Sequence, residues 1–135
     1  MFISHSAYSF KFGVLKTKDV LRMAEKHGCI PLILAEINST AGILPALQDG
    51  RVPIQPAVDF RIGGLRIAVL LPESPLGFQR LNSWLSSARV SLTPDVPNIE
   101  DVRVIYPLSN VPARKLFFNE WIGVEHHEQI KALRH

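Results

Sequence analysis

The sequence contains a single cysteine, Cys29, among its 135 residues. One cysteine excludes an intrachain disulfide framework and a Cys-x-x-Cys zinc knuckle, and its place just before an apolar stretch indicates a buried structural thiol. Long hydrophobic runs are also missing, since none approaches the roughly 18–20 residues of a membrane span. The first residues lack the basic and long apolar regions of a secretory signal. We therefore expect a cytoplasmic protein that does not contact a membrane.

The chain also has no large excess of positive or negative charge. The net charge is only +3, and the lysines and arginines are dispersed rather than gathered in one basic run. A pI near 9.3 is compatible with nucleic-acid binding, but we interpret the basic residues as solvated surface. The hydrophobic fraction of 47% indicates a globular chain and argues against disorder. A length of 135 residues predicts one domain, residues 1–135.

Apolar strand-like segments alternate with helix-like segments along the chain. The strands are predicted at 1–5, 30–35, the second half of 52–60, 65–71, 102–106 and 121–124. The helices are predicted at 18–27, 41–48, from 75 to about 88, and 125–133, with end signals at Thr17, Gly28, Asn38–Thr40 and Ser74-Pro75. This alternation predicts an α/β fold of mostly parallel strands, with one hairpin-like exception at Gly63-Gly64.

Three of the predicted strands each run into one potential metal ligand. These ligands are His5, Glu36 and Asp59. In repeating β/α folds the carboxyl ends of successive strands converge on one face, where binding sites are built. The three residues are therefore the candidate metal site of this sequence.

Several motifs follow one another in a recognisable order. The first three motifs are residues 5–9 (HSAYS) with Gly13, residues 34–42 (LAEINSTAG) and residues 56–61 (PAVDFR). They are followed by the predicted strand 65–71 with residues 77–86 (GFQRLNSWLS), and then by residues 120–124 (EWIGV). Taken together they resemble the polymerase-and-histidinol-phosphatase (PHP) domain at the N-terminus of bacterial DNA polymerase III alpha subunits. The resemblance extends over nearly the whole chain.

The resemblance implies a partial (β/α) barrel of PHP type. Intact sites of that family hold two or three divalent ions with His and carboxylate ligands and hydrolyse phosphoesters. The present chain ends about halfway through such a domain, and the later ligand motifs and the polymerase palm have no counterpart. We expect either a fragment of the alpha subunit or a shortened stand-alone relative.

The ligands carry over only in part. His5 matches the second His of the opening His-x-His pair, but Ile3 stands at the first position. Glu36 takes an Asp position with one extra methylene, Ile37 stands where active relatives often place His, and Asp59 matches the usual Glu. We expect that this chain holds no metal; a competent site would use His5, Glu36 and Asp59 to bind zinc or manganese.

Each candidate ligand also has a structural interpretation. His5 is equally well explained as a hydrogen-bonded histidine at a strand end. Glu36 would suit the amides of Asn38–Thr40 at a helix start, and Asp59 would form an exposed strand pair with Arg61. Tyr8 and Ser9 are expected to order the first loop.

Two further groups of residues are weaker candidates. The run 125–128 (EHHE) places two histidines side by side, whereas helical zinc sites need them four residues apart, so we interpret it as a solvated helix start. A second group combines aromatic and basic residues, as surfaces that bind single-stranded nucleic acid do. It consists of Phe117, Phe118 and Trp121 with the nearby Arg114 and Lys115. A core or inter-domain contact is the preferred interpretation of these aromatic residues.

The resulting hypothesis is a structural PHP-domain segment of the replicative polymerase with a degenerate phosphoesterase site. Its expected partners are the remainder of the alpha subunit and other replisome proteins, with DNA contacted only indirectly. The alternatives are a small stand-alone metal-dependent phosphoesterase and an interaction module that docks a replication partner. Because half a barrel leaves sheet edges exposed, we also expect self-association.

Overall fold

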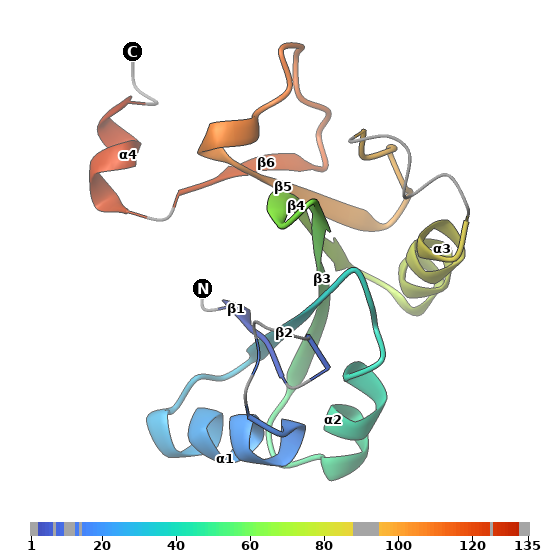
Figure 1. The fold of residues 1–135 in the computed structure, drawn as a ribbon, viewed down its shortest axis with the longest axis vertical. Helices are drawn as coiled ribbons and strands as arrows, with labels where there is room; N and C mark the ends of the chain where they lie inside the picture. The colour runs from blue at the N-terminus through green and yellow to red at the C-terminus, as the bar shows by residue number, and fades with distance from the viewer. Residues whose placement is uncertain are drawn as a thin grey trace.

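The fold was obtained as a computed structural model that describes residues 3–6, 8, 9, 13, 15–87, 95–124 and 126–132. The described chain has six strands and four α-helices, which alternate except at the β3–β4 hairpin and between β5 and β6 (Figure 1). In order they are β1 (Ile3–Ser4), α1 (Thr17–His27), β2 (Leu32–Ile37), α2 (Ile43–Asp49), β3 (Ile54–Ile62), β4 (Leu65–Pro72), α3 (Pro75–Leu85), β5 (Val102–Pro107), the 3₁₀ turn η2 (Leu108–Asn110), β6 (Glu120–Gly123) and α4 (His127–Ala132). No described helix is long and apolar enough to cross a membrane.

The strands form one open sheet in the order β1-β2-β3-β4-β5-β6. β1, β2 and β3 are parallel to one another, and β5 is parallel to β6. β4 is antiparallel to both of its neighbours, because the Gly63-Gly64 turn reverses the chain directly after β3. The predicted α/β class and the hairpin are confirmed. The sheet does not close, and closure into a PHP-type barrel remains a prediction.

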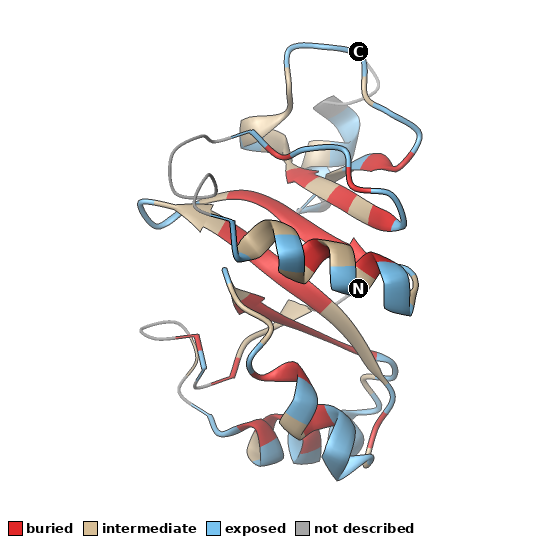
Figure 2. Ribbon diagram, turned by 90° about the vertical axis from the view of Figure 1, so that its right-hand side faces the viewer, coloured by how far each residue is buried: buried red, intermediate tan, exposed pale blue. Residues whose placement is uncertain are grey.

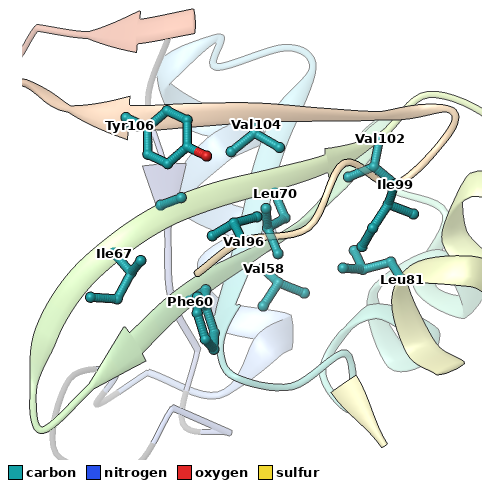
Figure 3. Close-up of a cluster of buried hydrophobic side chains, with 11 residues drawn as sticks. Val58, Phe60, Ile67, Leu70, Leu81, Val96, Ile99, Val102, Val104 and Tyr106 are labelled. Carbon is teal, nitrogen blue, oxygen red and sulfur yellow. The ribbon is translucent and has the colours of Figure 1, made fainter. Parts of the chain in front are cut away.

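Helices α1, α2 and α3 pack on the same face of the sheet, here called the outer face. The α1 stripe predicted from the sequence, Val20, Leu21 and Ala24, is buried against Leu34 of β2. α3 places Leu81 in a second cluster with strands β3, β4 and β5 (Figure 3). The remaining members of that cluster are Val58, Phe60, Ile67, Ala68, Leu70, Val96, Ile99, Val102, Val104 and Tyr106.

The opposite, inner face of the sheet is strongly curved. Ile3 of β1 and Trp121 of β6 line one pocket beside a buried inner-face cluster, although four strands separate β1 from β6. The middle of this cluster is formed by the small residues Ala35 and Ala57, with Ile33, Val69 and Leu71 around them. Small side chains on the concave side allow the two ends of the sheet to approach each other. The centre of the sheet is thereby buried on both faces, as the buried segments in Figure 2 show.

The helix ends follow the predicted chemistry in part. α1 ends at Gly28, whose φ of 64° requires the left-handed conformation that glycine adopts without strain. Ser74 caps α3 by accepting a hydrogen bond from the Gly77 backbone N–H at 3.0 Å. Thr17 was predicted as the N-cap of α1, but Lys16 is the cap and Thr17 the first helical residue.

The start of α2 also differs from the prediction. Residues 38–40 were expected to cap it, but its N-cap is Gly42 and the helix begins at Ile43. The reason is that Asn38 and Thr40 bond to other elements, Asn38 to β3 and Thr40 to Asn82 of α3. Of the predicted last helix, α4 is confirmed for His127–Ala132, whereas 125 and 133 lie outside the described residues.

A close backbone contact fixes the start of α3 against the turn before β5. A Cβ atom on Gly77 would lie 2.2 Å from the carbonyl oxygen of Asp101, far inside van der Waals contact. Asp101 also accepts a hydrogen bond from Ser74 Oγ at 3.0 Å, and its own φ is 59°. The glycine of the motif at 77–86 therefore has a packing role.

Candidate functional site

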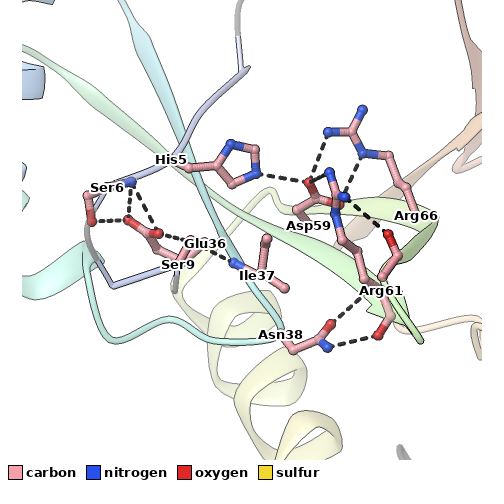
Figure 4. Close-up of polar contacts among 10 residues, drawn as sticks. His5, Ser6, Ser9, Glu36, Ile37, Asn38, Asp59, Arg61 and Arg66 are labelled. Carbon is pink, nitrogen blue, oxygen red and sulfur yellow. Dashed lines mark hydrogen bonds and ion pairs between the residues drawn. The ribbon is translucent and has the colours of Figure 1, made fainter. Parts of the chain in front are cut away.

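The three predicted ligands lie on two different faces of the sheet. Side chains alternate along a strand, and paired residues of parallel strands share a face. Glu36 pairs with Val58 on the outer face, whereas Ile37 pairs with Asp59 on the inner face. The same alternation continues from β1, so that His5 reaches Asp59 and Ser6 reaches Glu36 (Figure 4).

Asp59 is the centre of the inner-face group. Its carboxylate is fully buried and accepts a hydrogen bond from Nε2 of His5 at 2.9 Å. Arg66 donates to both of its oxygens, from Nε at 3.0 Å and from a terminal nitrogen at 2.9 Å. Arg61 adds a further bond at 3.0 Å. One buried carboxylate therefore holds two guanidinium groups and an imidazole.

A bulge between β3 and β4 brings the second arginine to this group. Phe60 pairs with Ala68, but the next residue, Arg61, pairs with Arg66, so Ile67 is an extra residue in β4. With regular pairing Arg66 would lie opposite Ile62, on the face of the hydrophobic core. The extra residue moves Arg66 to the inner face beside Arg61 and leaves Ile67 in the core.

These contacts determine the charge of Asp59. Burial on its own would raise the pKa of the carboxyl group. The hydrogen bonds from His5, Arg66 and Arg61 outweigh that effect and hold the pKa of Asp59 well below its ordinary value of 3.8. The group is therefore a carboxylate at neutral pH, and its single negative charge is shared by two arginines.

Glu36 has a different environment on the outer face. It is fully buried and accepts hydrogen bonds from the Ser6 backbone N–H at 3.1 and 3.2 Å, from the Ser6 hydroxyl and from the Ser9 hydroxyl. Ser9 Oγ in turn accepts from the Ile37 N–H at 2.9 Å. Gly42 packs directly on this carboxylate, because a Cβ there would lie 2.6 Å from Oε1. Glu36 thus ties the first loop to β2.

Asn38 supports the Asp59 group, whereas the sequence predicted that it caps α2. Its φ of 52° turns the chain at the end of β2. The side-chain amide donates to the Arg61 carbonyl at 2.8 Å and accepts from the Arg61 N–H at 2.7 Å. These two bonds fix the backbone of Arg61 next to the bulge, and so support the position of the guanidinium that binds Asp59.

The structure places the predicted residues as follows. His5 and Asp59 are in contact, and Glu36 binds elsewhere; among the described residues no three His, Cys, Asp or Glu side chains form a group able to hold a metal ion. His5 is a hydrogen-bonded histidine at a strand end, as its structural interpretation predicted. The pairing of Asp59 with Arg61 is present but buried, and Glu36 contacts the first loop rather than the amides of 38–40.

A third buried carboxylate, Glu120, was missed by the sequence reasoning. Its side chain is 1% exposed and receives two bonds of 2.7 Å from Arg114, one of 2.8 Å from the Phe117 N–H and one of 3.0 Å from the Tyr106 hydroxyl. The Arg114 bonds lower the pKa of Glu120 to about 2 despite its burial. Burial, together with Glu120, raises the pKa of Tyr106 to about 12. The alternation of 120–124 predicts a buried side chain but not its partner.

The aromatic residues of this region are exposed. Phe118 is 94% exposed, and Phe117 and Trp121 are about half exposed. Arg114 lies over the Phe117 ring and Arg103 over the Trp121 ring, at 4.5 and 4.0 Å from the ring centres. A core position is therefore wrong for these residues within this chain, whereas the other half of the preferred interpretation, an inter-domain contact, stays a prediction. Of the run 125–128, Glu125 lies outside the described residues, and His126 and Glu128 are exposed.

Comparison with known proteins gives one similarity. An error-prone DNA polymerase of Symbiobacterium thermophilum is 31% identical over 94 residues. The chain is similar to a segment of a DNA polymerase. The match covers 67% of this chain and 9% of the polymerase, so the chain spans only a small part of that protein. No family model matches the chain, and no solved structure matches it.

Proposed function

We propose that this chain is a PHP-type segment of a bacterial replicative DNA polymerase and that its role there is structural. The similarity to an error-prone DNA polymerase supports the polymerase part of the proposal. The order of strands, the hairpin after β3 and the bound His5–Asp59 pair are compatible with the PHP part. In this role the domain supports the polymerase, and its contact with DNA is indirect.

The observation that best supports a structural role is that two arginines already bind the carboxylate of Asp59. A catalytic metal centre of hydrolases needs several His and carboxylate ligands that converge on the ion. Here Asp59 is bound by Arg61 and Arg66, and Glu36 faces the other side of the sheet. A divalent cation at His5 and Asp59 would have to displace two guanidiniums from a buried carboxylate. We propose that the arginines have replaced the metal as the counter-charge.

The polymerase assignment is tested on the native protein. An antibody raised against this chain is used to detect and purify the polypeptide that contains it from the native cells, followed by mass spectrometry. We expect a polypeptide much larger than 15.1 kDa, or a complex, that carries DNA polymerase sequence and activity. A 15.1 kDa polypeptide that does not purify with a polymerase would contradict the assignment.

The structural role is tested separately. The purified 135-residue chain is analysed for bound zinc and manganese and is assayed for hydrolysis of a generic phosphodiester with either metal added. We expect substoichiometric metal and no hydrolysis above the blank. Hydrolysis that is abolished in His5→Ala but retained in the exposed-histidine control His126→Ala would instead identify a stand-alone phosphoesterase.

A further inference from the structure

A pocket lies at the N-terminus of α1, beside α2, which packs next to α1 below the sheet (Figure 1). Its volume is about 390 Å³, and its described lining consists of Tyr8, Lys16, Thr17, Lys18 and Pro45. A pocket of this size suits a small molecule. None of the lining residues belongs to the group around Asp59, so the pocket is separate from the candidate site described above.

The start of α1 has no side-chain cap. Its N-cap is Lys16, whose side chain has no acceptor for a backbone N–H. The Lys16 carbonyl accepts from the N–H groups of Asp19 and Val20 at 2.9 and 3.1 Å, whereas those of Thr17 and Lys18 precede this first bonded turn. N–H groups without an intrahelical partner, together with the positive end of the dipole of an 11-residue helix, favour an anion at this end.

Thr17 gives a second, independent indication of a ligand. The residue is only 8% exposed and lines the pocket, yet its hydroxyl oxygen has no hydrogen-bond partner among the described residues. Buried hydroxyl groups are nearly always bonded, because an unpaired one has lost its contacts with water and gained nothing in return. An acceptor bound in the pocket would give this hydroxyl the partner that the protein does not provide.

The charge of the pocket lining is positive. Lys16 and Lys18 are exposed, and neither forms an ion pair with an acid of the described chain. Asp19 in the first turn of α1 lies 3.7 Å from Arg22 and is not part of the described lining. Glu36 is bonded by the first loop and is also outside the lining. The pocket therefore combines hydrogen-bond donors with two ammonium groups.

We propose that this pocket binds a phosphate group, either free phosphate or the phosphate of a small phosphomonoester. The Thr17 hydroxyl and the first N–H groups of α1 donate to the phosphate oxygens, and Lys16 and Lys18 supply the counter-charge. Tyr8 borders the pocket from the first loop, where its N–H donates to Ser6 Oγ at 3.3 Å. The inference does not rest on the proposed function, since it concerns a different pocket.

The test is isothermal titration calorimetry of the 135-residue chain with inorganic phosphate, with chloride at equal ionic strength as the blank. We expect saturable binding of one phosphate per chain. Thr17→Val keeps the shape of the side chain and removes the hydroxyl, so it should weaken binding at least about tenfold, as for a lost hydrogen bond to a charged group. Thr17→Ser keeps the hydroxyl and should bind like the wild type. Circular dichroism verifies that each variant is folded.

The part played by the lysines is tested by a matched pair of variants. Lys18→Gln and Lys26→Gln remove the same charge from exposed positions at opposite ends of α1. Lys18→Gln should weaken binding about fivefold, as expected for one charge at close range in water, and Lys26→Gln should leave binding unchanged.

The source of the phosphate is distinguished by titration with thymidine 5′-monophosphate, with thymidine as the ligand that lacks phosphate. Tighter binding of the monophosphate than of inorganic phosphate, with no binding of thymidine, would identify a phosphomonoester site. Binding of the monophosphate no tighter than that of inorganic phosphate would identify a site for free phosphate. Both results support the proposal.

Three results would overturn it. The first is the absence of any heat above the chloride blank in the millimolar range of phosphate. The second is binding that Thr17→Val leaves unchanged and that Lys18→Gln and Lys26→Gln weaken equally, which would show a general effect of charge. The third is thymidine that binds as tightly as its monophosphate, which would assign the pocket to the base or sugar. None of these outcomes bears on whether the native polypeptide is a polymerase.

Discussion

Replacement of Asp59 by asparagine tests the central electrostatic group of the molecule. The change keeps the size of the side chain and removes its negative charge, which leaves Arg61 and Arg66 without their buried counter-charge. Removing one partner of a buried ion pair typically costs about 3–5 kcal/mol. The two arginine side chains are 15% and 26% exposed, so water partly screens them. We therefore expect Asp59→Asn to lower the free energy of unfolding by about 2–3 kcal/mol.

The pH dependence of this effect has a definite sign. The folded pKa of Asp59 lies well below the ordinary value of 3.8, so the folded state favours the carboxylate more than the unfolded state does. This contribution is fully present above about pH 4 and is lost as the pH falls toward the folded pKa. The difference between the wild type and Asp59→Asn should therefore be largest near neutral pH and should shrink in acid.

The assay is urea unfolding followed by circular dichroism at a series of pH values. The matched control is Asp19→Asn, because Asp19 is 45% exposed and lies 3.7 Å from Arg22, itself 61% exposed. A surface pair of this kind contributes less than about 0.5 kcal/mol. If Asp59→Asn were as mild as this control, or if its effect did not change with pH, the reasoning on the buried charge group would be refuted.

Three further changes probe other contacts. Glu36→Gln replaces an acceptor-only carboxylate with an amide whose nitrogen cannot accept the Ser9 hydroxyl, and should cost about 1–3 kcal/mol in urea unfolding. An unchanged midpoint would contradict the conclusion that Glu36 ties the first loop to β2. Gly77→Ala places a Cβ 2.2 Å from the Asp101 carbonyl oxygen and should lower stability by about 1–3 kcal/mol, measured by thermal unfolding. Glu120→Gln removes a negative charge beside Tyr106, so the phenol should titrate below its wild-type pKa of about 12, as followed by tyrosinate absorbance; a pKa that stays at 12 would assign the whole shift to burial.

Local chemistry in the sequence was sufficient for most of the elements. The spacing of Val20, Leu21 and Ala24 predicts a helix with one buried stripe, and Gly28 predicts its end, because both depend on residues within a few positions of each other. Ser74-Pro75 predicts the start of α3 for the same reason. The resemblance to the polymerase domain also depends on the order of short motifs, which is a property of the sequence alone.

The candidate site could be predicted only in part. His5, Glu36 and Asp59 were found from the sequence as polar residues next to apolar strands, although β2 continues to Ile37 and β3 to Ile62. Which of the three share a face depends on the pairing register of β1, β2 and β3. A shift of one residue exchanges the faces, and register is set by packing between distant segments. For this reason the sequence grouped three ligands where the fold joins His5 to Asp59 and separates Glu36.

What the sequence determined by itself is the α/β class, the helix stripes and the set of chemically active residues, since these follow from the period of apolar side chains and from local turns. Only the tertiary structure decided that Asp59 faces two arginines. A bulge in β4 moves Arg66 onto its face, and no local pattern marks that extra residue. The physical reason is that charge pairing across strands depends on register and burial, and both arise when segments far apart in the chain pack together.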